Sequence, residues 1–170
     1  IKIINKNNLK FYFVGSGSNL LVNDKKINAI IITPAKALKS LTIKKNTINA
    51  ESGVMLGRLV KEAIKHKLTG LESLVGVPGT LGGALMMNAG AWGSEISNYL
   101  KSVKVIKTSG EIKTLHPKDI DFKYRHSSFK SSEFILSAKF ELSKATKVEI
   151  KKKKLIASKG RISTQPLKFR

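Results

Sequence analysis

Cysteine is absent from the sequence of 170 residues, and its absence removes several classes of chemistry. The chain can form no disulfide, iron–sulfur cluster or thiolate zinc site, and it has no thiol nucleophile. The three histidines, His66, His116 and His126, show no metal-ligand spacing, so we expect no metal site. No apolar run approaches the roughly 20 residues of a membrane-spanning helix, and the N-terminus lacks a signal-peptide pattern. We therefore expect a cytoplasmic protein that does not insert into a membrane.

Acidic and aromatic residues are also scarce. The sequence has 11 Asp and Glu against 32 Lys and Arg, a formal net charge of +21, and only 6% aromatic residues. Such a charge keeps a non-enzymatic, basic nucleic-acid-binding module as an alternative. However, only 4 of the basic residues are Arg, and the lysines are spread along the chain apart from residues 151–154. We expect a solvated lysine-rich surface and no nucleic-acid partner, and a basic cleft would suit a phosphate-bearing ligand.

Hydrophobic periodicity divides the chain into short strands and a few helices. Hydrophobic residues make up 41% of the sequence, which is ordinary for one globular domain or two small ones. Polar tips between apolar runs predict two hairpins, and apolar residues at helical spacing predict a helix that ends before Gly70. The expected strands are residues 9–14, 29–32, 41–43, 47–50, 103–107, 111–115 and 134–142, and the expected helical segments are 55–67, 117–120 and 146–159. The class is α+β, with hairpins outnumbering helices.

A glycine-rich loop, residues 15–19 (GSGSN), follows the first expected strand. In that position, tight glycine turns allow backbone N–H groups to approach a phosphate. The loop is not a dinucleotide fingerprint, because Leu20 stands where GxGxxG has its third glycine, and it lacks the Lys-Ser/Thr pair of a P-loop. Taken alone, the loop is more typical of a plain turn between two strands.

A second glycine-rich segment, residues 76–93, carries six glycines in 18 positions and almost no charge. Glycine and other small residues remove side-chain bulk where a flat ligand or another backbone approaches closely. Asn88 adds an amide that can address a heterocycle edge or a phosphate. Met86 and Met87 are expected in the hydrophobic core rather than against a ligand. The segment favours a ligand-binding surface over a purely structural glycine cluster.

Together these segments resemble the UDP-N-acetylenolpyruvoylglucosamine reductase (UDP-N-acetylmuramate dehydrogenase) family, flavoenzymes of bacterial peptidoglycan synthesis. The likeness rests on residues 13–22, on residues 76–93, and on residues 122–130, which match the family's FxYRxSxF segment. Arg161 and the Gln165-Pro166-Leu167 element near the end agree with it. The glycine-rich segment alone is shared with other flavoproteins of the vanillyl-alcohol-oxidase-like fold. Another FAD oxidoreductase of that fold is therefore an alternative, against which the FxYRxSxF and Gln-Pro-Leu matches argue.

The resemblance implies an α+β fold of the vanillyl-alcohol-oxidase-like (PCMH) type that binds FAD between two subdomains. Residues 1–33 would be the remainder of the first FAD-binding subdomain, residues 34–143 the second, and residues 144–170 a helical linker toward a substrate-binding domain. It also implies that NADPH is the reductant and that UDP-N-acetylglucosamine enolpyruvate is reduced to UDP-N-acetylmuramate. The residues that the resemblance places against FAD are Gly15, Ser16, Gly17, Ser18, Asn19, Leu20, Gly76, Pro78, Gly79, Thr80, Gly82, Gly83, Ala84, Asn88, Gly90 and Ala91.

Arg125 matches the family's catalytic arginine in the FxYRxSxF segment. The resemblance implies that negative charge develops at the carboxyl-bearing end of the enolpyruvyl group. An arginine suits that place, because it is always charged and can hold a carboxylate through two hydrogen bonds. Tyr124 is expected beside the substrate, and so is Trp92, which stands where the family commonly has tyrosine. Ser127 and Ser128 are expected to be loop hydroxyls rather than nucleophiles, because no base is placed for either.

The sequence departs from the family's pattern at both ends. The family has a segment before the first strand, and after the Gln-Pro-Leu element it continues into a GSxFKNP-like segment and a substrate domain. Those parts carry the serine that protonates the intermediate and a catalytic glutamate, and we find no counterpart of either. We therefore expect a fragment of the compact subtype that does not complete the reaction alone. A complementing C-terminal polypeptide is a possible partner.

Overall fold

The computed structural model describes residues 1–164, and its mixture of helices and sheet confirms the α+β class. The Gln165-Pro166-Leu167 element lies outside the described residues. The helices are α1 (Lys2–Lys6), α2 (Leu56–Lys65), α3 (Leu81–Met86) and α4 (Lys147–Thr164), with short 3₁₀ turns η1 (Pro34–Lys36), η2 (Glu72–Leu74), η3 (Ile96–Tyr99) and η4 (Pro117–Asp119). The strands are β1 (Phe11–Phe13), β2 (Ile30–Ile32), β3 (Leu41–Lys44), β4 (Thr47–Glu51), β5 (Leu68–Thr69), β6 (Gly90–Ala91), β7 (Ser94–Glu95), β8 (Leu100–Lys107), β9 (Ile112–Leu115), β10 (Phe122–Lys123), β11 (His126–Ser127), β12 (Glu133–Glu141) and β13 (Ser143–Lys144).

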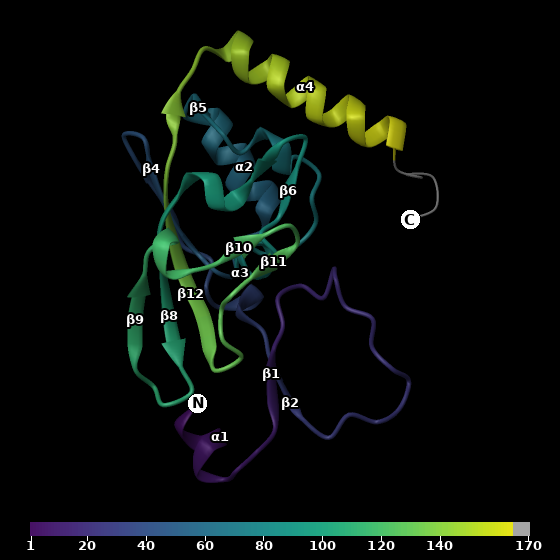
Figure 1. Ribbon diagram of the computed structural model, residues 1–170, viewed down its shortest axis with the longest axis vertical. Coiled ribbons are helices and arrows are strands. Elements are labelled where there is room, and N and C mark those ends of the chain that lie inside the picture. The colour runs from purple at the N-terminus through teal and green to yellow at the C-terminus, as the bar shows by residue number, and fades with distance from the viewer. Residues whose placement is uncertain (165–170) are drawn as a thin grey trace.

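The main sheet has five antiparallel strands in the order β3-β4-β12-β8-β9 (Figure 1). The two predicted hairpins are confirmed as β3–β4 and β8–β9, which form the two sides of the sheet. The long strand β12 fills the middle by pairing with both β4 and β8. Buried and exposed residues alternate along β4, because successive side chains of a strand point to opposite faces. One face of the sheet is therefore apolar.

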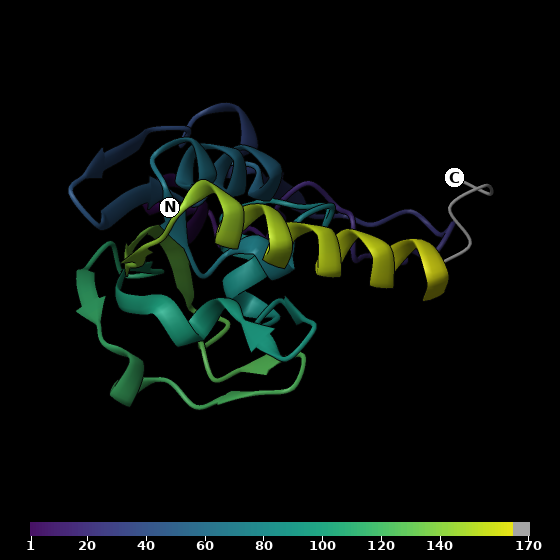
Figure 2. The same ribbon diagram turned by 90° about the horizontal axis from the view of Figure 1, so that it is seen from above.

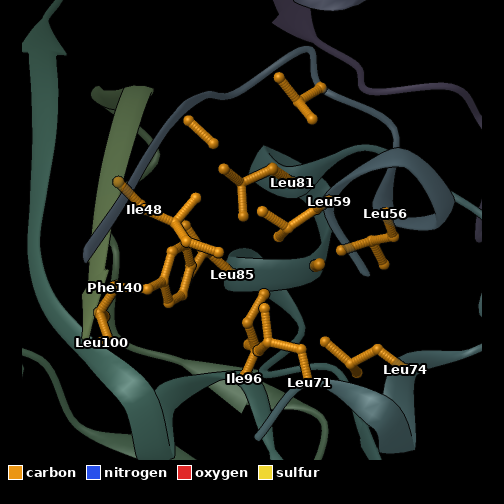
Figure 3. Packing of buried hydrophobic residues seen from close by; sticks show 14 of the residues in the cluster. Ile48, Leu56, Leu59, Leu71, Leu74, Leu81, Leu85, Ile96, Leu100 and Phe140 are labelled. Atoms are coloured by element: carbon orange, nitrogen blue, oxygen red, sulfur yellow. The ribbon is translucent and has the colours of Figure 1, made fainter. Parts of the chain in front are cut away.

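The hydrophobic core lies between that apolar face and the helices α2 and α3. Figure 3 shows Phe140 of β12 and Ile48 of β4 beside Leu85 of α3, and all three side chains are fully buried. The predicted helix is confirmed as α2, whose apolar residues recur at helical spacing and face inward. The buried residues that α2 contributes to this core are Leu56, Leu59, Val60 and Ala63.

α3 places one methionine differently from the expectation drawn from the sequence. The buried face of this helix consists of Leu81, Ala84 and Leu85, at positions i, i+3 and i+4. Met86 falls outside that face and is 39% exposed, and Met87 just after the helix is half-buried. The expectation of core packing was therefore wrong for Met86, because three other apolar residues already fill the inward face of this short helix.

The first strands form a small unit beside the main sheet (Figure 1). β1 and β2 pair in parallel, with Phe11 opposite Ile30. Parallel strands need a long connection, which here is the loop of residues 14–29 rather than a helix. The rings of Phe13 and Phe134 stack with their centroids 3.5 Å apart. Aromatic packing therefore attaches this unit to the beginning of β12.

α4 lies at the end of the molecule opposite α1, and Figure 2 shows its last turns extending past the other helices. Thr146 and Glu149 form a capping box: the N–H of Thr146 donates to the Glu149 carboxylate at 2.8 Å, and the N–H of Glu149 donates to the Thr146 hydroxyl at 3.2 Å. Ile150 and Ala157 are buried, and the helix contacts η2. No helix within residues 1–164 has the length and apolar character needed to span a membrane.

Candidate functional site

The two glycine-rich segments singled out from the sequence meet in the structure. A Cβ atom on Gly15 would lie 2.5 Å from Oγ1 of Thr80, and a Cβ atom on Gly79 would lie 3.1 Å from Oγ of Ser18. The first distance leaves no room for a methyl group at Gly15. Gly79 and Thr80 are buried under the loop of residues 15–19, while most of the loop is exposed. The two segments therefore form one continuous surface.

The glycine-rich loop is fixed at its ends and open in its middle. The hydroxyl of Thr33 donates to the carbonyl of Gly15 at 2.9 Å, and the N–H of Leu20 donates to the carbonyl of Gly17 at 3.1 Å. Within the part of the chain that the structure describes, the N–H groups of residues 16–18 donate to no acceptor of the protein. Gly17 has a φ of +76°, which its lack of a side chain permits. Successive exposed amides in such a turn are suited to bind an anion.

The N–H groups at the start of α3 are already used by the protein. The N–H of Leu81 donates to the carbonyl of Val54 at 2.8 Å. The N–H of Gly82 donates to the carbonyl of Ser52, also at 2.8 Å, and the hydroxyl of Thr80 caps the helix. The N–H groups that remain for a phosphate are therefore those of residues 16–18 in the loop after β1, rather than those at the start of α3.

The expected cofactor residues around α3 fall on two sides of the chain. Gly82 lies against Ser52, since a Cβ atom on it would be 3.1 Å from the Cβ of that serine. Ala84 is only 5% exposed and belongs to the hydrophobic core. Gly83 and Pro78, by contrast, are exposed. Gly83 and Pro78 are thus accessible to a ligand, whereas Ala84 supports the segment from below.

Trp92 stands in the turn of the β6–β7 hairpin and lies against α4. Trp92 and Gly93 both have positive φ values, +55° and +77°, a combination that is typical of tight two-residue hairpin turns. A Cβ atom on Gly160 would lie 2.6 Å from the indole ring, so the ring rests on the backbone of α4. The indole is nevertheless 44% exposed. Its contact with a substrate stays a prediction.

Two polar contacts from α4 reach the glycine-rich segment and strand β5, and the sequence did not reveal them. Nη1 of Arg161 donates to the carbonyl of Gly76 at 3.1 Å. Nζ of Lys153 donates to Oγ1 of Thr69 at 2.9 Å. In the sequence, Lys153 is one of four consecutive lysines, and nothing distinguishes it from the solvated members of that run. Arg161 is distinguished in the sequence only by its match to the family.

Asn88 is buried beside the β6–β7 and β10–β11 hairpins. Its side chain is fully buried, and its Nδ2 atom donates to Oε2 of Glu95 at 2.6 Å and to the carbonyl of Lys123 at 3.2 Å. Its Oδ1 atom is also buried and accepts no hydrogen bond from residues 1–164. The donor capacity of Asn88 is therefore used within the protein. Contact with a cofactor stays a prediction, for which Oδ1 is the free atom.

The β10–β11 hairpin carries Tyr124 and Arg125 in its turn. Tyr124 is 79% exposed, and the guanidinium of Arg125 lies over its ring, 4.8 Å from the centroid. Arg125 has a φ of +54° and is exposed. The neighbouring Lys123 donates to Asp121 at 2.8 Å, and this hydrogen bond raises the pKa of Lys123 above its ordinary value. Asp121 thus compensates the charge of Lys123, while the turn presents the charge of Arg125 to solvent.

The two serines after this turn make hydrogen bonds within the protein, and Ser127 lies on strand β11 rather than in a loop as expected. The hydroxyl of Ser127 donates to the carbonyl of Met86 at 2.6 Å, and Ser127 is only 5% exposed. The hydroxyl of Ser128 accepts from the N–H of Asp121 at 2.8 Å.

Within residues 1–164, no group of three His, Asp or Glu side chains is placed to hold a metal ion.

The glycine loop after β1 and the glycine-rich segment beside an antiparallel sheet agree with the flavin-binding domain that the resemblance implies. The chain belongs to the FAD binding domain family, whose model matches residues 1–116. Its relatives include UDP-N-acetylenolpyruvoylglucosamine reductases of Clostridium kluyveri (strain NBRC 12016) and Streptococcus pneumoniae (strain Hungary19A-6), which are 41% and 39% identical over 170 residues. Each alignment covers 99% of this chain and 56% of the relative, so the chain spans about half the length of these relatives. The resemblance drawn from the motifs is confirmed.

Solved structures agree with this assignment. The crystal structure of a UDP-N-acetylenolpyruvylglucosamine reductase from Thermus caldophilus matches with a TM-score of 0.82 at 27% identity, over 96% of this chain and 60% of that one. A solvent-stable cholesterol oxidase matches with a TM-score of 0.64 at 16% identity, over 83% of this chain and 31% of that one, which shows the fold alone. The expected fold class is confirmed.

Proposed function

We propose that this chain is the flavin-binding part of an NADPH-linked reductase that converts UDP-N-acetylglucosamine enolpyruvate to UDP-N-acetylmuramate in peptidoglycan synthesis. The observation that carries the proposal is the contact of Gly15 with Thr80, which joins the two glycine-rich segments into one surface. The names of the relatives at about 40% identity support the choice of reaction. The proposed location is the cytoplasm, because the reaction consumes NADPH and a nucleotide sugar.

The residues present fit FAD. The exposed N–H groups of residues 16–18 suit the negatively charged pyrophosphate. The small, uncharged residues of 76–93 allow a flat ring system to approach the backbone. We propose that the sixteen residues expected from the resemblance hold the cofactor, with the accessible Pro78 and Gly83 in direct contact and the buried Ala84 shaping the surface. When bound, FAD supplies hydride transfer between NADPH and the enolpyruvyl group.

Arg125 is the proposed catalytic residue of this chain. Its guanidinium is exposed and permanently charged, so it can bind the carboxylate of the enolpyruvyl group and stabilise the negative charge that develops there. Tyr124 packs against the guanidinium and limits its movement. We propose that both side chains contact the substrate, and that Trp92 contributes the exposed part of its ring.

We propose a division of the chain into three parts. We propose residues 1–33, with the β1–β2 pair, and residues 34–143, with the five-stranded sheet, as the two FAD-binding subdomains, and residues 144–170 as the linker. We also propose that the proton-donating serine and the glutamate expected for the family come from a polypeptide segment outside these subdomains, in the same chain or in a complementing one. Residues 1–170 would then bind the ligands without completing the reaction.

Titration of the purified chain with FAD tests the proposal. We expect saturable binding of one FAD per chain, seen as a rise in flavin fluorescence anisotropy, and a further absorbance change of the bound flavin when the enolpyruvyl nucleotide is added. The Arg125→Ala variant should bind FAD like the unaltered chain and lose the second change. A chain that bound no FAD but bound RNA with a steep salt dependence would contradict the proposal and favour the basic nucleic-acid module.

A further inference from the structure

Two hydrogen bonds tie the β10–β11 hairpin to the end of α3. From β11, the hydroxyl of Ser127 donates to the carbonyl of Met86 at 2.6 Å. From β10, the carbonyl of Lys123 accepts from Nδ2 of Asn88 at 3.2 Å. The donor residues Ser127 and Asn88 are 5% and 0% exposed, whereas the acceptor residues are exposed, so the bonds are shielded from water on the donor side. Hydrogen bonds in such surroundings are costly to break, because the freed groups cannot exchange them for bonds to solvent.

The two bonds lie on either side of the turn that carries Arg125. Lys123 precedes Tyr124 and Arg125, and Ser127 follows them, so each strand of the hairpin is fixed close to the turn. Further from the turn, the rings of Phe122 and Phe129 pack edge to face with centroids 6.1 Å apart. The burial of apolar surface is not directional, so this packing attaches the base of the hairpin without specifying its orientation. The hydrogen bonds to Asn88 and Met86 fix the orientation of the hairpin.

Asn88 stands just after α3, in the turn that ends this helix. The N–H of Ala89 donates to the carbonyl of Ala84 at 2.8 Å, as in helices that end in a left-handed residue. Asn88 is that residue, with a φ of +40° that asparagine adopts more readily than most residues. Its Nδ2 atom also donates to Oε2 of Glu95 at 2.6 Å, so one side chain links the β6–β7 hairpin to the β10–β11 hairpin. Glu95 is in turn fixed by Asn98, whose Oδ1 accepts from its N–H at 2.7 Å. One buried side chain thus links the end of α3 to both hairpins.

We propose that Asn88 and Ser127 are positioning residues that orient the Tyr124–Arg125 turn, so that the guanidinium of Arg125 meets the substrate carboxylate in a fixed geometry. The proposal rests on the proposed role of Arg125. It also explains the serine of the FxYRxSxF segment: Ser127 acts through the hairpin rather than on the substrate. A displacement of about 1 Å at a reacting group can cost as much as a hundredfold in rate, so an anchor of this kind matters.

The adjacent serines provide a matched pair of variants. Ser127→Ala removes the bond to Met86, whereas Ser128→Ala removes a bond to Asp121 that does not reach α3. We expect Ser127→Ala to weaken the binding of UDP-N-acetylglucosamine enolpyruvate to the FAD-loaded chain about tenfold, measured by calorimetry, and to change the affinity for FAD less than about twofold. Ser128→Ala should change both affinities less than about twofold. Equal effects of the two variants on nucleotide binding would overturn the proposal.

A double-variant cycle separates positioning from general destabilisation. If Ser127 acts through the guanidinium, Ser127→Ala should have no further effect on nucleotide affinity once Arg125 has been replaced by alanine. An undiminished effect in that background would assign Ser127 a merely structural role. Asn88→Ala should likewise weaken nucleotide binding only while Arg125 is present, and it should speed hydrogen exchange of the paired amides of the β10–β11 hairpin about tenfold. If Arg125→Ala binds the nucleotide as tightly as the unaltered chain, the proposed role of Arg125 fails, and the positioning proposal fails with it.

Discussion

The hydroxyl group of Thr80 occupies the space that a side chain on Gly15 would need, since a Cβ atom there would lie 2.5 Å from Oγ1. This contact holds the glycine-rich loop down on the start of α3. Neighbouring exposed amides of the loop are thereby brought over the glycine-rich segment. The surface proposed for FAD therefore depends on the absence of a side chain at Gly15.

Gly15→Ala should weaken FAD binding about tenfold or more, because the added methyl group pushes the loop away from Thr80. Gly57→Ala is a matched control, since Gly57 lies in α2 and a Cβ atom on it would meet nothing within 4 Å. The control should bind FAD normally and raise the free energy of unfolding by about 0.5–1 kcal/mol, because alanine favours a helix over glycine. Fluorescence titration and denaturant unfolding measure the two quantities. Normal FAD affinity in Gly15→Ala would contradict the placement of the cofactor.

Gly160→Ala should move the indole ring of Trp92. A Cβ atom on Gly160 would lie 2.6 Å from the ring, closer than carbon atoms can approach, so the ring must turn outward. Trp92 is the one tryptophan of the sequence, and its fluorescence reports on this contact alone. We expect the emission maximum of Gly160→Ala to shift toward longer wavelength as the ring gains water. The same substitution at Gly57 should leave the emission unchanged, and an unshifted spectrum for Gly160→Ala would show that α4 does not hold the ring.

The contacts of Trp92 and Asn88 illustrate what the sequence could not provide. Their partners, Gly160 and Lys123, are distant along the chain, and neither has a pattern that pairs it with a particular residue. Sequence reasoning placed Trp92 at the substrate because the segment around it matches a family. The ring's seat on α4 depends on how two separate elements pack, and only the folded chain contains that information.

Local features, by contrast, were predictable. The hairpins β3–β4 and β8–β9 were found because alternating apolar residues flank a polar tip, and both signals lie within a dozen residues. The helix α2 was found from its apolar spacing. The glycine-rich segments were found from composition, and the family resemblance placed both against FAD. Their meeting at Gly15 and Thr80 is a tertiary contact that was not predicted. Met86 was misplaced because the inward face of α3 was already filled.

Acid should loosen the start of α4. Hydrogen bonds from the backbone and hydroxyl of Thr146 hold the pKa of Glu149 below its ordinary value. The stabilisation is present above the pKa of about 4.3 that glutamate has in an unfolded chain, and it is lost as the pH falls through the lower pKa of the folded state. Glu149→Gln keeps a capping side chain at every pH. As the pH is lowered from about 7 to 2.5, the helical circular dichroism signal should therefore decrease more in the unaltered chain than in Glu149→Gln. Parallel curves for the two proteins would contradict the capping box.

Phe13→Ala should loosen the attachment of the β1–β2 unit without unfolding the main sheet, although Phe11 also contacts Phe134, with ring centroids 5.8 Å apart. The ring of Phe13 stacks on Phe134, and a pair of this kind contributes about 0.5–1.5 kcal/mol beyond the burial of its surface. Neither Phe13 nor Phe134 belongs to the main hydrophobic core, which lies between the sheet and the helices α2 and α3. The midpoint of the main unfolding transition should therefore shift little. The loop of residues 14–29 should be cleaved faster by a protease, and FAD affinity should fall because the loop is no longer held over Thr80.

Tyr12→Ala is the matched control, because Tyr12 is the neighbouring aromatic residue of β1 but is 44% exposed. If both variants were cleaved at the same rate, the stacking of Phe13 on Phe134 would not be what attaches the first strands to the sheet.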